Sequence, residues 1–215
     1  RDRTSVERAV TRARPHEIYN LAASASSTAS WHNPSDVLDI NCTGVASLLS
    51  PAVKQNPSVR FFQASSCQIF GEPATAPQNE ETPMRPHTPY AVAKAAAHWM
   101  VDNLRRVNGA FACNGILYNH ESPRRHPDFV SRRISLGVAR IKLGMTKTLK
   151  LGNLEARRDW GYAPDYVKAM WAMLQQDDPR DYIIGSGTTH SVRDFVQAAF
   201  NHVGLDCNNH LSVDE

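Results

Sequence analysis

The sequence lacks the features that would assign it at once to several large classes of protein. None of its apolar runs approaches the roughly 18 residues that a membrane-spanning helix needs. Its net charge is only +3, far from that of a protein that packages nucleic acid. We expect free thiols in a reducing compartment and no metal site, because no C-x-x-C pair and no histidine spaced for zinc accompanies Cys42, Cys67, Cys113 or Cys207. These absences predict a cytoplasmic protein with neither a membrane nor a nucleic acid as its partner.

Strand-like and helix-like segments alternate along the chain. Thr88 with Pro89 is typical of a helix start, Gly109 of the position just past a helix end, and Ser191 with Asp194 of a capping box. The expected strands lie at 15–20, 59–66, 111–119, 148–153 and 182–187, and the expected helices at 5–13, 37–55, 89–108, 129–144, 164–176 and 191–204. This alternation predicts an α/β fold with a largely parallel sheet.

Tyr90 and Lys94 lie four residues apart on the helix that Pro89 opens, so both side chains project from one face. An ammonium group beside a tyrosine lowers the cost of forming its phenolate, and such a tyrosine can take a proton from a sugar hydroxyl. The spacing alone is weak, because it often arises by chance. Ser65 and Ser66 strengthen it, since a predicted strand ends in them at the edge where open α/β sheets bind ligands. These groups resemble the constellation of short-chain dehydrogenases.

Longer motifs narrow the resemblance to one family. The segments "NLAA" (20–23), "QASSCQIFG" (63–71), "EETPMRPHTPYAVAK" (80–94), "CNGILYNHESPRR" (113–125), "LGNLEARRDWGYAPDYVKAMW" (151–171) and "HSVRDF" (190–195) resemble the GDP-mannose 4,6-dehydratase family of extended short-chain dehydrogenases/reductases. The resemblance implies NADP as the cofactor, with NAD as the alternative, and a nucleotide sugar, GDP-linked, as the substrate. It also implies a homodimer or homotetramer, with the helix at 37–55 and the Tyr90 helix as contact faces.

The same resemblance implies a domain organisation. Residues 1–118, joined by later elements at about 145–175, are expected to form a Rossmann-type doubly wound parallel sheet that binds the dinucleotide. Residues 119–144 and 176–215 are expected to form a smaller substrate-binding lobe.

The resemblance also assigns roles to single residues. Tyr90 is expected to act as the base at the sugar 4-hydroxyl with Lys94 as its partner, while Ser66 bonds the 4-oxygen. The expected cofactor contacts are Leu21, Ala22, Ala23, Tyr90, Lys94 and Arg125. The expected substrate contacts are Ser66, Asn119, Arg133 and Arg158, whose forked guanidinium suits a diphosphate.

Two parts of the family pattern are missing. The glycine-rich phosphate turn is absent, so we expect a longer parent chain whose first βαβ unit precedes Arg1. Gln68 stands where the family has a catalytic glutamate that removes the proton at carbon 5 of the sugar. An amide is not a base, and a positioned general base contributes roughly 10²- to 10⁴-fold. The step at carbon 4 therefore keeps Ser66, Tyr90 and Lys94, whereas the elimination lacks its usual base.

The motifs favour a nucleotide-sugar 4,6-dehydratase, a lyase that oxidises carbon 4, eliminates water and returns hydride to carbon 6. Cys67, His120 or a water would then replace the missing base. Because of Gln68, a 4-epimerase or 4-reductase on the same scaffold is the first alternative, and a weakened non-catalytic subunit is the second. Trp160 and Trp171 are expected in the core. A solvated face or a weak RNA-binding patch is the alternative for Arg124, Arg125, Arg132 and Arg133.

Overall fold

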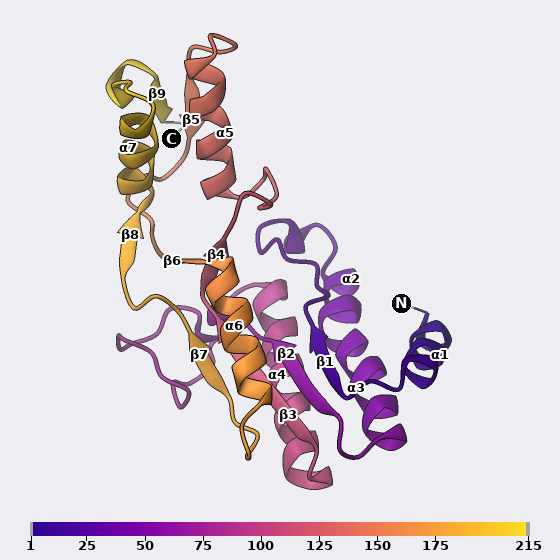
Figure 1. Ribbon diagram of the computed structural model, residues 1–215. Helices are drawn as coiled ribbons and strands as arrows, with labels where there is room; N and C mark the ends of the chain where they lie inside the picture. Colours follow the sequence, from indigo (N-terminus) through magenta and orange to yellow (C-terminus); the bar gives the residue numbers. More distant parts are fainter. Residues whose placement is uncertain (1, 214–215) are drawn as a thin grey trace. The chain divides into compact units, whose positions relative to one another are not determined.

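The computed structural model describes residues 2–213, which form two compact units. The first comprises residues 2–118 and 167–184, and the second comprises residues 119–166 and 185–213. Both combine helices with strands (Figure 1), so the predicted α/β class is confirmed.

The division departs from the expected one in two segments. Residues 145–166 belong to the second unit, because β6 (Arg157–Tyr162) pairs with β4 (Asn119–Glu121) and β8 (Thr189–Ser191). Residues 176–184 belong to the first unit, because β7 (Tyr182–Ile184) extends its sheet. The expectation had placed residues 145–166 with the dinucleotide-binding domain and residues 176–184 with the smaller lobe.

A four-stranded parallel sheet forms the centre of the first unit, in the order β1-β2-β3-β7. The strands that precede β7 in this order are β1 (Glu17–Asn20), β2 (Arg60–Ala64) and β3 (Phe111–Leu117). Neighbouring residues Phe61 and Phe62 of β2 point to opposite faces, and both are fully buried. Both faces of the sheet are thus covered, as expected for parallel strands. Helix α6 (Ala163–Leu174) crosses in front of these strands in Figure 1.

Helix α4 (Pro89–Asn108) carries Tyr90 and begins where the sequence predicts. The Thr88 Oγ1 accepts a hydrogen bond from the Ala91 backbone N–H at 3.1 Å, and Gly109 follows the last turn with φ 63°. Ala97 and Val101 of α4 pack against Phe61 together with α3 (Gly44–Gln55). This packing fixes the buried face of α4 against β2.

The helical stretch at 37–55 is longer and less regular than predicted. It begins with α2 (Pro34–Leu38), which Asn33 caps, and passes through a single wide π-helical turn, η2 (Asp39–Thr43), before α3. The buried Asn41 lies in this turn. Its amide accepts a hydrogen bond from the Ser24 N–H at 2.7 Å and donates one to the Ser24 carbonyl at 3.0 Å. The turn therefore holds the loop that leaves β1. The remaining helix of this region is α1 (Arg3–Ala13).

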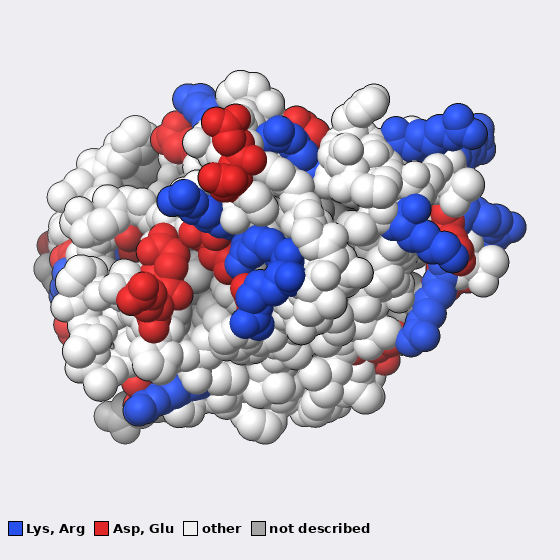
Figure 2. All heavy atoms as spheres, turned by 90° about the horizontal axis from the view of Figure 1, so that it is seen from below, with Lys and Arg blue, Asp and Glu red and all other residues white. Residues whose placement is uncertain are grey.

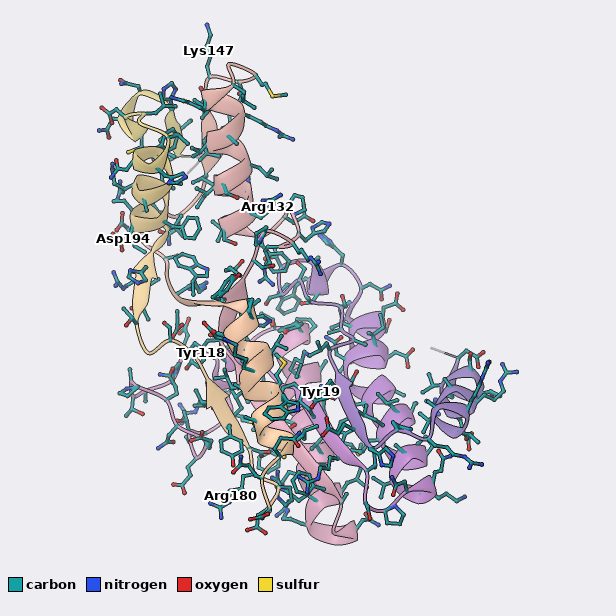
Figure 3. All side chains as sticks on the ribbon, in the orientation of Figure 1. Tyr19, Tyr118, Arg132, Lys147, Arg180 and Asp194 are labelled. Carbon is teal, nitrogen blue, oxygen red and sulfur yellow. The ribbon has the colours of Figure 1, made fainter. Side chains whose placement is uncertain are left out.

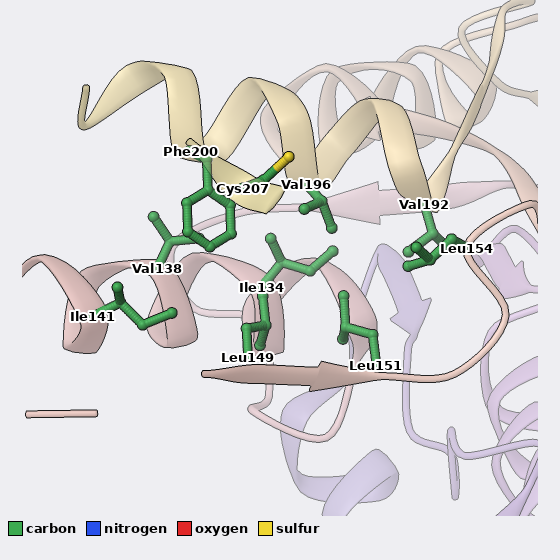
Figure 4. Packing of buried hydrophobic residues seen from close by; sticks show 10 residues of the cluster. All are labelled: Ile134, Val138, Ile141, Leu149, Leu151, Leu154, Val192, Val196, Phe200 and Cys207. Atoms are coloured by element: carbon green, nitrogen blue, oxygen red, sulfur yellow. The ribbon is translucent and has the colours of Figure 1, made fainter. Parts of the chain in front are cut away.

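The second unit has its own core between two helices. Its small sheets are β4-β6-β8 and the parallel pair β5 (Leu149–Leu151) and β9 (Leu211–Val213). Helices α5 (Val130–Lys142) and α7 (Val192–His202) bury Ile134, Val138, Val196 and Phe200 between them (Figure 4). The predicted capping box is confirmed, since Ser191 and Asp194 exchange hydrogen bonds of 3.0 and 2.8 Å; Figure 3 labels Asp194 at the start of α7.

The surface carries both signs of charge. Lys and Arg side chains are interspersed with Asp and Glu on the face drawn in Figure 2. Trp171 is 58% exposed, so its expected place in the core was wrong, whereas Trp160 is half-buried with its ring edge-on to Phe195 at 5.3 Å. Within residues 2–213, no helix combines the length and the apolar character that crossing a membrane requires.

Candidate active site

Lys94 is fastened to the carboxyl end of β2. Its side chain is only 3% exposed, and its Nζ donates a hydrogen bond of 2.7 Å to the Ala64 carbonyl oxygen. The same ammonium lies 5.8 Å from the centroid of the Tyr90 ring, which is itself buried. Spacing along α4 thus places both groups on one face, as predicted, and beside the strand that ends at Ala64.

Burial changes the acid strength of this lysine. Removal of the ammonium from water lowers the pKa of Lys94 from 10.5 to about 8. The amine thus remains mostly charged at neutral pH while lying close to its titration range. Such a group can support a neighbouring phenolate and is sensitive to modest changes of pH.

The hydroxyl loop, residues Ser65–Gly71, leaves β2 at the same edge of the sheet. Ser66 is buried, and its Oγ accepts a hydrogen bond of 3.3 Å from the Gln68 N–H at the start of η3 (Cys67–Phe70). The Gln68 side chain is exposed, whereas Cys67 is partly buried. The loop ends at Gly71 with φ 61°, where an added Cβ would lie 1.9 Å from the Arg85 carbonyl oxygen. Only glycine fits there, so the backbone conformation at the end of the loop is fixed.

A series of buried polar contacts, from Ser65 through His98 to Asp181, also holds the hydroxyl loop. The sequence analysis did not predict these contacts. The Ser65 Oγ lies 3.2 Å from His98 Nδ1, and His98 Nε2 lies 3.3 Å from a carboxylate oxygen of Asp181. Burial alone would raise the pKa of Asp181, but hydrogen bonds from His98 and Arg105 outweigh it and hold that pKa well below its usual range. One available signal was the spacing of His98, which follows Lys94 by four residues on the same helix face.

The expected cofactor loop follows β1. Leu21 and Ala22 are exposed and Ala23 is half-buried. The loop is held at both ends, because Asn20 Oδ1 accepts a hydrogen bond of 3.3 Å from the Ala22 N–H and Asn41 holds Ser24. A cavity of about 210 Å³ lies beside Asn20 and Ala22, smaller than the roughly 300–1,000 Å³ typical of ligand pockets. Small side chains on a fixed loop at the carboxyl edge of a parallel strand suit a dinucleotide.

The second unit carries the other predicted residues. Asn119 begins β4, and its carbonyl oxygen accepts a hydrogen bond of 3.5 Å from the Tyr166 hydroxyl. Arg125 lies within 3.2 Å of Glu121 and stacks on the Phe129 ring at 3.6 Å, so its guanidinium is already engaged inside this unit.

Arg133 and Arg158 are exposed on different elements of the second unit. Arg133 lies on α5, and Arg158 lies on β6 opposite His190 of β8. The Arg158 guanidinium donates a hydrogen bond of 2.6 Å to the Arg157 carbonyl oxygen. In the first unit Ser66, Tyr90 and Lys94 are buried while Leu21, Ala22 and Gln68 are exposed, and the second unit carries Asn119 and the three predicted arginines. Within the described residues, no three His, Cys, Asp or Glu side chains gather in a group suited to a metal ion.

Solved structures of other proteins share this architecture. RMD from Pseudomonas aeruginosa complexed with NADPH superposes with a TM-score of 0.88 at 24% identity, covering 93% of this chain and 69% of that chain. The UDP-glucose 4-epimerase of Thermotoga maritima with UDP-glucose gives 0.88 at 23% identity, covering 100% of this chain and 69% of that chain. The predicted Rossmann-type fold is thereby confirmed.

Sequence relatives are closer. GDP-mannose 4,6 dehydratase 1 of Arabidopsis thaliana is 43% identical over 218 residues, covering 100% of this chain and 60% of its own length. The human GDP-mannose 4,6 dehydratase is 46% identical over 206 residues, covering 94% of this chain and 55% of its own length. The chain thus spans between half and two thirds of these curated relatives. The family described as GDP-mannose 4,6 dehydratase matches residues 1–215. The chain therefore belongs to the GDP-mannose 4,6-dehydratase family.

Proposed function

We propose that the protein is a nucleotide-sugar 4,6-dehydratase that acts on GDP-mannose with NADP. The observation that supports this most directly is the buried pair Tyr90 and Lys94, fastened to the end of β2 in a chain of this family. NADP is the expected cofactor and NAD the alternative. When bound, the dinucleotide would accept hydride from carbon 4 of the sugar and return it at carbon 6.

The first unit holds the groups for the oxidation at carbon 4. Tyr90 acts as a phenolate that takes the proton from the 4-hydroxyl. The Lys94 ammonium beside it stabilises this phenolate. Ser66 donates a hydrogen bond to the 4-oxygen while its own oxygen stays anchored by the Gln68 N–H. Leu21, Ala22 and Ala23 would hold the cofactor through their backbone, since two of these side chains are too small to block it.

We assign binding of the nucleotide to the second unit. Arg158 and Arg133 are exposed, and their forked guanidinium groups match the oxygens of a diphosphate. Asn119 would contact the sugar. Arg125 would reach a cofactor only by leaving Glu121 and Phe129. We therefore expect its main role to be holding the segment between these two residues in its observed conformation.

Gln68 favours a second candidate function. An exposed amide at the place of the family's glutamate cannot remove the proton at carbon 5. A 4-epimerase or 4-reductase needs only the step at carbon 4, for which Ser66, Tyr90 and Lys94 are present. In the dehydratase, Cys67, His120 or a water would replace the base.

Product analysis separates these candidates. We expect the full-length protein, incubated with GDP-mannose and NADP, to give a 4-keto-6-deoxy sugar by NMR. An inverted or reduced carbon 4 would support the alternative, and a protein that gives no product would fit the non-catalytic subunit.

The variant Gln68→Glu tests the missing base. We expect it to raise the dehydration rate by roughly 10²-fold or more, because it restores a carboxylate at that place. Gln78→Glu is the matched control, since Gln78 lies outside the hydroxyl loop. If the rate stays unchanged in Gln68→Glu, another group already serves as the base.

We also propose that the protein acts in the cytoplasm as a homodimer or homotetramer. Helix α4 exposes Val92 and Trp99, by 44% and 54%, and α2 exposes Leu38 by 40%. Apolar side chains of this size on helices suit a contact between copies of the chain. Light scattering at micromolar concentration should give at least twice the mass of one chain, and a monomer would contradict the proposal.

A further inference from the structure

A buried polar chain in the first unit takes no part in the proposed chemistry. Ser65 and His98 are 3% and 5% exposed, and they link the hydroxyl loop to Asp181 just before β7. Asp181 in turn accepts hydrogen bonds of 2.7 and 3.0 Å from Arg105 and one of 2.8 Å from the Asn114 N–H. The chain thus connects β2, α4, β3 and the segment that leads into β7.

The order serine, histidine, aspartate also occurs in hydrolases, but this arrangement does not suit a nucleophile. A nucleophilic serine must reach a substrate carbonyl. Ser65 is buried, and its own N–H is held by the Gly115 carbonyl oxygen at 2.9 Å. Its hydroxyl faces His98 inside the unit. The chain of contacts therefore holds structure in place and attacks no substrate.

Two side chains of helix α4, one helical turn apart, form hydrogen bonds to the carboxyl end of β2 and the residue that follows it. Lys94 holds the Ala64 carbonyl oxygen at 2.7 Å, and His98 holds the Ser65 hydroxyl at 3.2 Å. The residue after Ser65 is Ser66, and the residue one turn before Lys94 is Tyr90. Two fixed points determine both the distance and the orientation of the helix relative to the strand end. A single point would leave the strand end free to pivot.

We propose that His98, oriented by Asp181, is a positioning residue that fixes the hydroxyl loop relative to Tyr90 and Lys94. The proposal rests on the proposed function, because it assigns Ser66 and Tyr90 to the same sugar oxygen. The carboxylate of Asp181 selects the tautomer in which His98 Nε2 carries the proton. Nδ1 is then the acceptor that the Ser65 hydroxyl needs. Arg105 keeps Asp181 in place by binding both of its oxygens.

The kinetic test compares His98→Leu with His98→Asn in the full-length protein, with GDP-mannose as the substrate. Asparagine offers an oxygen acceptor near the place of Nδ1, whereas leucine offers none. We expect kcat to fall about 10- to 100-fold in His98→Leu with KM changed less than about twofold, because a small misplacement of reacting groups slows the chemical step. His98→Asn should recover most of the rate. Equal losses in both variants, or a rise in KM alone, would overturn the proposal.

Asp102→Asn is the matched control for the ion pair between Asp181 and Arg105. Asp102 lies on the same helix, pairs with Arg105 at 2.9 Å and has the same 16% side-chain exposure as Asp181, but it does not hold His98. We expect Asp181→Asn to lower kcat as His98→Leu does, and Asp102→Asn to leave it near the wild-type value. If Asp102→Asn slows the reaction as much, a general loss of ion pairing explains the effect and the positioning role is refuted.

Hydrogen exchange of the peptide that covers residues 63–71 tests the positioning apart from the reaction. His98→Leu should speed its exchange at least severalfold, whereas His98→Asn and Asp102→Asn should not. If the wild-type protein fails to convert GDP-mannose, the proposed function falls, and this measurement still decides whether His98 holds the loop. Unchanged exchange in His98→Leu would overturn the proposal even in an active enzyme.

Discussion

Replacement of Lys94 by methionine should stabilise the protein while abolishing the proposed activity. Burial lowers the pKa of Lys94 from 10.5 to about 8, so at pH 7 the folded state carries an ammonium that it disfavours by about 3 kcal/mol, at about 1.36 kcal/mol for each pKa unit. Methionine fills similar space without a charge. The lost hydrogen bond to Ala64 costs about 1 kcal/mol, and the Ala64 oxygen keeps the hydrogen bond from Gln63 at 3.0 Å. The net gain should be about 2 kcal/mol.

The size of this stabilisation depends on pH. Because the folded pKa lies below the unfolded one, the penalty is fully present below about pH 8 and fades as pH rises toward 10.5. At pH 9.5 it should have fallen to roughly half, which brings Lys94→Met close to the wild type.

Thermal melting of the full-length protein at pH 7 and pH 9.5 checks both points. Lys94→Met should melt roughly 4–8 °C above the wild type at pH 7, with a much smaller gap at pH 9.5. Lys54→Met, at an exposed position of α3, is the matched control and should shift little at either pH. The reasoning would be refuted if Lys94→Met melted below the wild type at pH 7, or if its gain were the same at both pH values.

Three further outcomes are expected. Gly71→Ala should lower the melting temperature by the equivalent of about 1–3 kcal/mol or more, since its Cβ would meet the Arg85 carbonyl oxygen; Gly109→Ala, with a similar φ and open space around it, should cost less. Phe200→Ala should destabilise the second unit by about 3–5 kcal/mol in urea, and a loss below about 1 kcal/mol would contradict its complete burial. The rate of GDP-mannose oxidation should decline above about pH 8 as Lys94 loses its proton, so a rate that rises steadily to pH 10 would argue against its role.

Local signals in the sequence predicted much of the first unit. Thr88, Pro89 and Gly109 set the bounds of α4 because capping depends on only a few neighbouring residues. The four-residue spacing of Tyr90 and Lys94 placed both on one face, since helix geometry fixes that relation.

Contacts between residues distant in the sequence escaped prediction. His98 contacts Ser65 and Asp181 across 33 and 83 residues, and its spacing from Lys94 indicates only its helix face, not these partners. The segment Arg157–Tyr162 forms β6 although its polar residues lack the alternation typical of a strand, because β4 and β8 supply its partners. That pairing also places residues 157–162 in the second unit.

The wide turn at Asp39–Thr43 has a consequence for how this protein tolerates change. Deletion of one residue there would restore ordinary α-helical winding and rotate Asn41 by about 100° relative to one of its flanking helices. The amide would then swing away from Ser24 and release both of its backbone groups. The shape of the loop at 21–23 is thus encoded partly in a helix that follows it, outside the loop itself. Substitutions of the side chains at 21–23 should accordingly leave the backbone path of this loop unchanged.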